Sequence, residues 1–411
     1  MQIELDQYGL QPQHRCISMA SLATPNTTTP LCARSHVVLL PEMRTASAWQ
    51  LLLPAVLCCC CIGGTADEGW RCRFPAVFNF GDSNSDTGGF WAAFLAQPPP
   101  FGVTYFGRLV IDFITQAMGL PLLSPYLQSV GSDFRHGANF ATLASTALPP
   151  NTSLFVTGIS PFSLAIQLRQ MKELSSRAIA SDDASGQLPP PGVLRDSLYT
   201  IDIGQNDFTS NLASQGIERV KRTLPSVISQ ISQTMQDLYS IRARKFMVFN
   251  MAPIGCYPAF LAELPHGSHD LDEYGCMTSY NSAVVYYNEL LNNSLAKVRK
   301  TLQGASIVYV NKYSVMLELF RHPEDHGLKY GTKACCGCGG GAYNFSPDLY
   351  CGTSKVVKGN IASATACGDP QNYVSWDGIH ATEAANNIIA SAVMSGAYSY
   401  PPSGLSKLCQ P

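Results

Sequence analysis

Four short apolar segments recur along the chain and constrain its fold more than any other feature. They cover residues 77–80, 197–203, 245–250 and 305–311, and they read VFNF, SLYTIDI, KFMVFN and ASIVYVN. Each is rich in β-branched and aromatic residues, and none alternates cleanly between apolar and polar positions. Strands buried on both faces have this composition, and such strands form parallel sheets that helices cover on both sides. The segments therefore predict a parallel sheet within an α/β fold.

Two long segments between these strands have the period of an amphipathic helix. Their apolar stripes consist of Ile217, Val220, Leu224, Val227, Ile228, Ile231, Met235 and Leu238 in the first, and of Val284, Leu291, Leu295, Val298 and Leu302 in the second. Strands that alternate with such helices are typical of a doubly wound α/β domain. Because no internal repeat or long linker separates the segments, a single domain is predicted.

The composition narrows the class of protein. A chain of 411 residues with 46% hydrophobic content can bury a large core. The net charge of −2 and the absence of a Lys/Arg block argue against a nucleic-acid-binding surface. Charged residues make up only 14% of the chain, below the usual quarter of a soluble protein, and this favours an extracellular protein over a cytosolic one.

Residues 43–66 have the pattern of a secretory signal peptide. Arg44 supplies a short basic region, residues 51–62 form an apolar region too short to span a bilayer, and small residues follow it. We therefore predict that residues 1–42 are a gene-model extension and that residues 43–66 are a signal peptide. Residues 67–411 would then form the single secreted domain, without a segment long enough to span a membrane.

Secretion accounts for the cysteines beyond the signal peptide, because an oxidising compartment favours disulfides. Cys256 and Cys276 flank one loop and form the disulfide that we predict. Cys335 and Cys336 are adjacent and have no C-x2-C partner pair, so we predict neither a zinc site nor any other metal or cofactor. The predicted N-glycosylation sites are Asn151, Asn292 and Asn344.

Three polar motifs lie where strands end or where the last helix begins. Gly81-Asp82-Ser83 follows the first strand, the motif GQND follows the second, and Asp377 precedes His380 by three residues. In α/β folds, reacting groups lie at the carboxyl ends of strands. The spacing of three allows a carboxylate to bind the imidazole Nδ1–H, which leaves Nε2 free to take a proton from a serine. Taken singly, each motif is also typical of a surface turn or a loop cap.

Together these motifs resemble the plant GDSL esterase/lipase family within the SGNH-hydrolase superfamily. The resemblance includes RLVIDFI, LPLLSPYL, FRHGANFAT, NMAPIGCYP, ACCG, YNFSPDLYCG and YVSWDGIHATEAAN, and it extends over about residues 74–398. It implies a flavodoxin-like, three-layer α/β/α fold with a five-stranded parallel sheet.

The resemblance also implies the roles of individual residues. Ser83 matches the nucleophile, Asp377 the orienting acid and His380 the general base. The oxyanion hole would consist of the backbone N–H of Ser83, a backbone N–H at Ala144 and the side-chain amide of Asn206. A serine hydroxyl needs a base to become a good nucleophile, and the tetrahedral oxyanion needs preorganised donors, so this set of residues is chemically consistent.

Two features depart from the family pattern. Position 144 is alanine where the family usually has glycine, and at a positive φ angle a Cβ atom costs ~1–2 kcal/mol. Relatives also carry roughly nine more residues before the RLVIDFI segment, in a loop that Gly107, Arg108 and Leu109 close directly in this chain. Both departures lie near the expected nucleophile.

The sequence therefore predicts a secreted serine esterase of the apoplast or cell wall. Its substrates would be carboxylic esters, including acetyl esters, of a glycan, a specialised metabolite or a lipid, so its partner would be a small-molecule or polysaccharide ester. Two alternatives stay open. The first is an acyltransferase with the same triad, in which an alcohol replaces water. The second is a binding protein whose catalysis is impaired by Ala144 and the shortened loop.

Overall fold

The computed structural model describes residues 73–94, 107–150, 160–180, 186–357, 360–402 and 408. The predicted gene-model extension, the predicted signal peptide and the sequon at Asn151 lie outside these residues. Within the described residues, no helix combines the length and the hydrophobicity that a transmembrane span requires.

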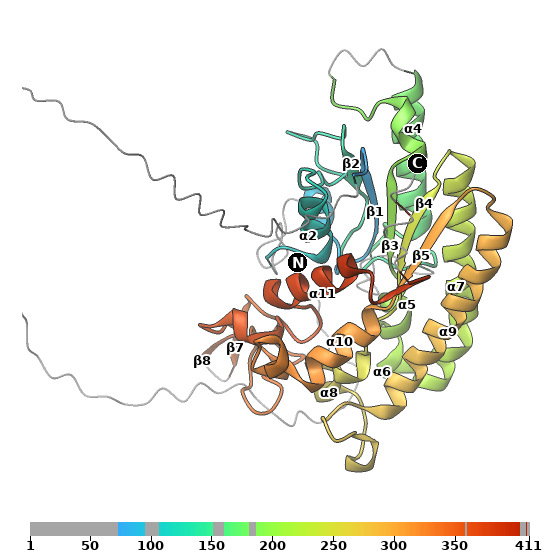
Figure 1. Cartoon of the computed structure of the whole chain (residues 1–411). Helices are drawn as coiled ribbons and strands as arrows, with labels where there is room; N and C mark the ends of the chain where they lie inside the picture. The colour runs from blue at the N-terminus through green and yellow to red at the C-terminus, as the bar shows by residue number, and fades with distance from the viewer. Residues whose placement is uncertain are drawn as a thin grey trace, which may run out of the picture. The chain divides into compact units, whose positions relative to one another are not determined.

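A six-stranded sheet forms the centre of the domain (Figure 1). Five strands run parallel in the order β2-β1-β3-β4-β5, which is the flavodoxin-like order. The predicted fold class and the five parallel strands are thus confirmed, whereas β10, antiparallel to β5 at the edge, was not predicted. The strands are β1 (Val77–Gly81), β2 (Gly137–Asn139), β3 (Leu198–Asp202), β4 (Lys245–Phe249), β5 (Ser306–Val310) and β10 (Ser399–Tyr400).

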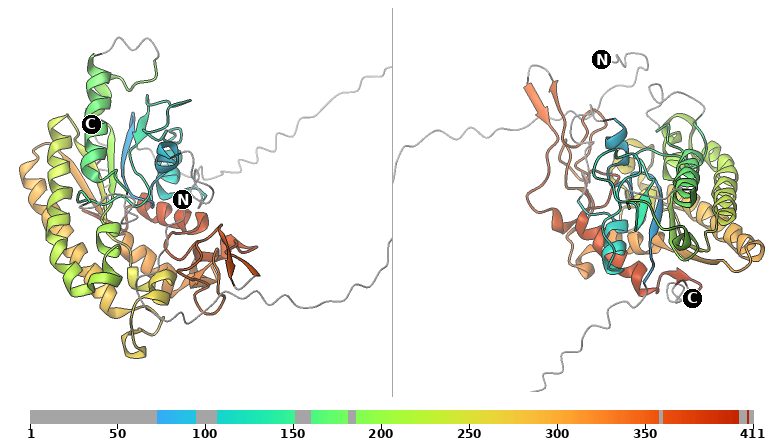
Figure 2. Two further views of the ribbon diagram at one scale, coloured as in Figure 1. Left: turned by 180° about the vertical axis from the view of Figure 1, so that it is seen from behind. Right: turned by 90° about the horizontal axis from the view of Figure 1, so that it is seen from above.

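Helices cover both faces of this sheet. On one side α7 (Ile217–Ser240) packs against α4 (Leu164–Ala180) and α9 (Thr278–Thr301), and on the other α2 (Val110–Ala117) packs against α11 (Glu383–Ser395), as Figures 1 and 2 show. The shorter helices are α1 (Gly89–Ala93), α5 (Gln205–Thr209), α6 (Leu212–Gln215), α8 (Pro258–Glu263) and α10 (Lys312–Arg321). The 3-10 turns are η1 (Pro191–Arg195), η2 (Ile254–Cys256), η3 (Ser268–Asp270), η4 (Pro323–His326) and η5 (Pro370–Asn372).

The core explains why the strand sequences do not alternate. Every residue of β1 is buried, because helices exclude water from both faces of the sheet. Phe78, Tyr199 and Phe246 occupy matching positions on β1, β3 and β4, and their rings contact one another at centroid distances of 5.3 and 5.8 Å. The buried hydroxyl of Tyr199 donates to the carbonyl of Leu194, so no polar group of this aromatic row lacks a partner.

A disulfide-bonded segment between α10 and α11 adds two small sheets. β6 (Tyr330–Ala334) pairs with β9 (Tyr373–Ser375), and β7 (Ser354–Val357) pairs with β8 (Asn360–Ser363). Disulfides join Cys335 to Cys367 and Cys336 to Cys351, so both adjacent cysteines are structural. The predicted disulfide between Cys256 and Cys276 is confirmed.

Candidate active site

The loop that follows β1 presents Ser83, and a buried glutamine from α4 fixes the start of this loop. The Gln167 side chain accepts a hydrogen bond from the Gly81 N–H at 3.0 Å and donates to the Gly81 carbonyl at 2.8 Å. A Cβ atom at position 81 would lie 2.7 Å from the backbone oxygen of Asp202, so glycine is required there by close approach of β3. The end of β1, two residues before Ser83, is therefore held rigidly.

Ser83, His380 and Asp377 form a continuous hydrogen-bonded chain. His380 Nε2 lies 2.8 Å from Ser83 Oγ, and His380 Nδ1 lies 2.7 Å from Asp377 Oδ2. The second carboxylate oxygen of Asp377 accepts the backbone N–H groups of Ile379 and His380 at 2.9 and 2.8 Å. Since an ionised carboxylate only accepts hydrogen bonds, this contact assigns the imidazole proton to Nδ1 and leaves Nε2 as the acceptor for the serine hydroxyl.

The disulfide-bonded segment supports the turn that carries Asp377 and His380. β9 leads directly into this turn, and the Cys336 N–H donates to the Trp376 carbonyl at 2.6 Å. The Trp376 N–H donates to the carbonyl of His380 at 2.8 Å, which closes the turn. Gly378 has φ +99°, and a Cβ atom there would approach the Phe345 ring to 2.8 Å, so the turn requires glycine.

The buried environment shifts the pKa values of the histidine and its acid in opposite directions. For His380, burial lowers the pKa, but the charge and the hydrogen bond of Asp377 outweigh it, so the net pKa is above the ordinary 6.5. For Asp377, burial raises the pKa, but the charge and hydrogen bonds of His380 outweigh it, so the net pKa is lowered. The pair is therefore stabilised as an imidazolium and a carboxylate, which is the state that a general base reaches after taking a proton.

A second buried acid, Asp82, lies beside the nucleophile. Burial raises its pKa to about 6, and the negative charge of Asp202 adds to the rise, whereas hydrogen bonds from Asn84 and the charge of Lys312 oppose it. Lys312 Nζ donates to both carboxylate oxygens of Asp202 at 2.6 Å in a largely buried ion pair. The charge of Asp82 also contributes to the raised pKa of His380.

The three predicted oxyanion donors have hydrogen atoms available. Among the described residues, the backbone N–H groups of Ser83 and Ala144 donate no hydrogen bond. The Asn206 side-chain amide donates one hydrogen to the Ser145 carbonyl at 2.9 Å and keeps its second hydrogen for another acceptor. Asn206 follows the tight turn at Gly204, where φ is +114° and a Cβ atom would lie 2.3 Å from the Tyr287 hydroxyl.

Two aspartates that the sequence analysis did not assign to the site bind the loop that contains Ala144. Asp86 accepts the N–H of Leu143, and Asp207 accepts the N–H groups of Ala147 and Leu148. Burial raises the pKa of Asp207 to about 7, although the two loop amides oppose the rise. Burial also raises the pKa of Asp86 against four backbone donors. The motif GQND could have indicated Asp207, because an aspartate after a strand commonly caps a loop.

Comparisons with known proteins identify the family of the chain. A model of the family GDSL-like Lipase/Acylhydrolase matches residues 77–393, from β1 into α11. The chain belongs to this family. GDSL esterase/lipase At4g01130 of Arabidopsis thaliana is 57% identical over 358 residues, which are 83% of this chain and 93% of that protein. Alpha-L-fucosidase 3 of the same plant is 40% identical over 355 residues, which are 83% of this chain and 93% of that protein.

The solved structures that match the chain are more distant. Axe2, an acetylxylan esterase from Geobacillus stearothermophilus, has a TM-score of 0.34 and 11% identity, covering 79% of this chain and 94% of Axe2. As a GDSL lipase/acylhydrolase, this chain is an enzyme that hydrolyses ester bonds.

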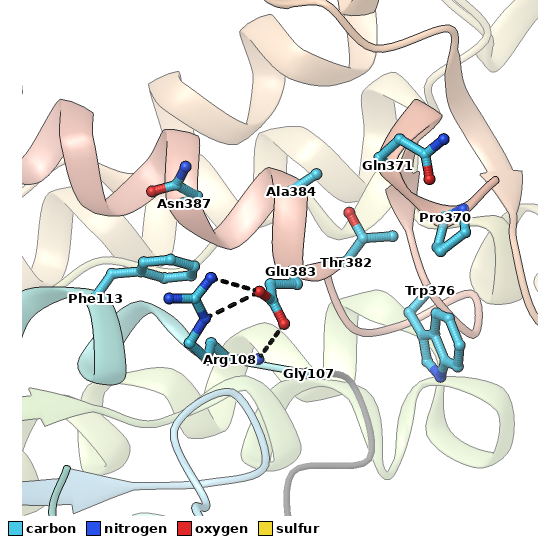
Figure 3. A pocket seen from close by; sticks show the side chains of 10 residues that line it. All are labelled: Gly107, Arg108, Phe113, Pro370, Gln371, Trp376, Thr382, Glu383, Ala384 and Asn387. Atoms are coloured by element: carbon cyan, nitrogen blue, oxygen red, sulfur yellow. Dashed lines mark hydrogen bonds and ion pairs between the residues drawn. The ribbon is translucent and has the colours of Figure 1, made fainter. Parts of the chain in front are cut away.

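A groove lies beside the turn that carries Asp377 and His380 in this GDSL hydrolase. It has a volume of about 460 Å³, and Trp376 and Thr382, which flank the turn, belong to its wall (Figure 3). The Arg108 guanidinium donates to Glu383 Oε1 at 2.8 and 2.9 Å and stacks 4.5 Å from the Phe113 ring. The segment of residues 107–109, which precedes α2, is thus attached to α11 through this ion pair.

The structure places the two described sequons of the GDSL hydrolase differently. Asn292 is half-buried on α9. The Asn344 amide donates to the Ala334 carbonyl at 3.0 Å, and its oxygen accepts the Gly340 N–H. Glycosylation at both sites stays a prediction. Within the described residues, no group of three or more His, Cys, Asp or Glu side chains could hold a metal ion.

Proposed function

We propose that this GDSL hydrolase is a serine esterase with Ser83 as nucleophile, His380 as general base and Asp377 as the acid that orients the imidazole. The observation that carries the proposal is the continuous contact from Asp377 through His380 to Ser83, with distances of 2.7 and 2.8 Å. A serine hydroxyl is a weak nucleophile until an adjacent base takes its proton, and this geometry supplies that base.

The proposed reaction has two balanced halves. His380 Nε2 takes the Ser83 hydroxyl proton while Oγ bonds to the ester carbonyl carbon, and the same proton then passes to the departing alcohol. Water attacks the resulting acyl-enzyme, giving its proton to His380, which returns it to Ser83 as the acid leaves. The N–H groups of Ser83 and Ala144 and the amide of Asn206 would bind the oxyanion in both halves.

The proposed substrates are carboxylic esters, including acetyl esters, of a glycan, a specialised metabolite or a lipid. The groove beside Trp376 is lined by none of Ser83, Asp377 and His380, so the proposed substrate class rests on the family of the chain.

Hydrolysis of short-chain nitrophenyl esters tests the function directly. We expect the purified protein to release nitrophenol from the acetate ester, with Ser83→Ala as the inactive control. Nitrophenol release that accelerates with an added alcohol, with a new ester as product, would identify an acyltransferase instead. No turnover of any ester would favour the impaired binding protein. Nitrophenyl α-L-fucoside should be inert, because glycosidases use a pair of carboxylates and Asp377 is committed to His380.

The pH dependence of kcat/KM follows from the raised pKa of His380. A general base must be neutral, so activity should fall as the pH falls through the pKa of His380, which lies above 6.5. Asp377→Asn removes the charge that raises this pKa, so the acid limb should move to lower pH while kcat falls by ~10⁴-fold. A flat profile between about pH 5 and pH 8 would contradict a histidine-dependent mechanism.

The alanine at position 144 gives a prediction for stability. Its φ angle is +60°, which is unfavourable for any residue with a Cβ atom. Ala144→Gly should raise the free energy of unfolding by about 1 kcal/mol, because relief of this strain exceeds the entropic cost of glycine. It should also raise kcat slightly, since the oxyanion donor is then unstrained. Ala147→Gly is the control, because Ala147 lies in the same loop without a positive φ angle. It should destabilise the protein.

We also propose that the protein is secreted and that its mature chain begins near Asp67. The support is the signal-peptide pattern of residues 43–66 together with disulfides such as Cys256–Cys276, Cys335–Cys367 and Cys336–Cys351, which persist in oxidising compartments. Expression from Met43 in a secretory host should deliver the protein to the medium. N-terminal sequencing should then begin near Asp67, and retention of residues 43–66 would contradict the proposal.

A further inference from the structure

Two carboxylates, the buried Asp86 and the half-buried Asp207, hold the loop of residues 143–148 from opposite ends. Asp86 lies after β1, on the segment that carries Ser83, and Asp207 lies after β3, directly beside Asn206. Asp86 Oδ2 accepts the Leu143 N–H at 2.6 Å. Asp207 accepts the Ala147 N–H at 2.7 Å on one oxygen and the Leu148 N–H at 3.0 Å on the other. The loop is thus attached to both segments that supply predicted oxyanion donors.

Ala144 lies between these attachment points in a conformation that it would not adopt by itself. Its φ angle is +60°, whereas alanine outside such restraints prefers negative φ angles. The preceding amide is bound by Asp86, and the following carbonyl accepts a hydrogen bond from Asn206 at 2.9 Å. A strained backbone conformation persists only where its surroundings determine it, and these contacts are such surroundings.

We propose that Asp207 and Asp86 are positioning residues of the oxyanion hole, which hold residues 143–148 so that the Ala144 N–H stays directed at the site of the oxyanion. The proposal rests on the proposed esterase function. Neither carboxylate touches the reacting atoms, since all the backbone groups that they bind belong to their own segments or to this loop. Asp86 and Asp207 affect the reaction rate by fixing the position of the Ala144 N–H group.

The chemistry of the two contacts explains why aspartate is needed at position 207. Each carboxylate oxygen accepts one loop amide, so both oxygens are used. Asparagine has a single acceptor oxygen, and its NH2 group would face the second loop N–H as another donor. Asp207→Asn therefore breaks at least one of the two contacts while it preserves the size of the side chain.

The first test compares kcat and KM of Asp207→Asn with the wild type. We expect kcat for nitrophenyl acetate to fall by about 10–100-fold, because displacement of a catalytic group by about 1 Å can cost as much. KM should change less than about twofold, since the ground-state carbonyl carries little charge. Asp112→Asn is the control: Asp112 is buried and also accepts a backbone N–H, that of Leu109, but it lies at the start of α2. Its kcat should match the wild type.

A rescue experiment separates positioning from general structural support. If release of the loop lets Ala144 return to negative φ, then glycine at this position should restore the productive conformation, because glycine has no Cβ penalty. Ala144→Gly should therefore recover kcat by about fivefold or more in the Asp207→Asn background, against about twofold or less in the wild type. Equal effects in both backgrounds would show that the two positions are uncoupled and would overturn the proposal.

Hydrogen exchange provides a readout that does not depend on turnover. In the wild type, the amides of Leu143, Ala147 and Leu148 should be protected and that of Ala144 should exchange faster. Asp207→Asn should accelerate exchange at Ala147 and Leu148. If that variant does not fold, Asp86→Asn and the wild-type exchange pattern provide the test. Absence of this protection overturns the proposal. Absence of ester turnover in the wild type overturns the proposed function, whereas turnover that is insensitive to Asp207→Asn overturns only the positioning role.

Discussion

Replacing Ser83 with alanine should abolish ester hydrolysis almost completely. The change removes the atom that attacks the carbonyl, and the loss of a triad nucleophile lowers kcat on the order of 10⁴–10⁶-fold. The fold should be unaffected, because among the described residues the Ser83 hydroxyl forms a hydrogen bond only with His380, at 2.8 Å. The residual rate should come from the oxyanion donors and from substrate binding, which do not depend on the serine. Initial-rate kinetics with nitrophenyl acetate measure this loss.

Ser85→Ala is the matched control for this variant. Ser85 is buried two residues after the nucleophile, and its hydroxyl has no hydrogen-bond partner among the described residues. Its removal should therefore leave kcat close to that of the wild type. A fluorophosphonate probe should label the wild type and Ser85→Ala at Ser83 and should fail to label Ser83→Ala. Comparable activity of Ser83→Ala and the wild type would refute the proposed nucleophile.

The strands in the middle of the sheet could be predicted from the sequence alone. The strand segments that begin at Val77, Lys245 and Ala305 agree with β1, β4 and β5 to within one residue at each end. Their signal is strong because both faces of these strands are buried, so most of their residues are β-branched or aromatic. The spacing of Asp377 and His380 was informative for a similar reason, since the contact lies within a single turn.

β2 could not be predicted from its own sequence. It consists of Gly137, Ala138 and Asn139, and these residue types are uncommon in strands. The structure shows what the strand requires instead. A Cβ atom at position 137 would collide with the Val77 carbonyl, so glycine permits the close approach to β1. Asn139 accepts a hydrogen bond from the Asn79 amide at 2.7 Å, a partner 60 residues away. Such causes are tertiary and leave no local pattern.

The residues that support the site could not be predicted either, because their partners are also distant in the sequence. Gln167 binds Gly81 across 86 residues of sequence, and Asp207 binds Ala147 across 60. Neither contact has a spacing that a helix or a strand would produce. The departure at Ala144 is different. The family pattern has glycine at this position, so the sequence already suggested a positive φ angle, and the structure shows that Ala144 adopts one.

Asn206→Ala should lower kcat by ~10²–10³-fold, which is the usual effect of losing one oxyanion donor. The substitution removes the amide N–H that would donate to the oxyanion in the transition state. Because the ground-state carbonyl carries little charge, KM should change less than kcat. The structure adds a cost in stability, because Asn206 also donates to the Ser145 carbonyl. Losing that bond should lower the free energy of unfolding by about 1 kcal/mol. Kinetics and thermal unfolding measure the two effects separately.

Two further variants, Asn206→Asp and Asn288→Ala, show whether the fall in kcat comes from the lost oxyanion donor or from lower stability. An ionised aspartate cannot donate, and it would face both the Ser145 carbonyl and the developing oxyanion, so its kcat should fall at least as far as that of Asn206→Ala. Asn288 is buried and binds the N–H and the carbonyl of Met251 at 2.9 and 3.0 Å. Asn288→Ala should therefore lose at least as much stability and keep its kcat. If both Asn206 variants retained normal kcat, Asn206 would serve only to hold Ser145, and the oxyanion would depend on the two backbone donors alone.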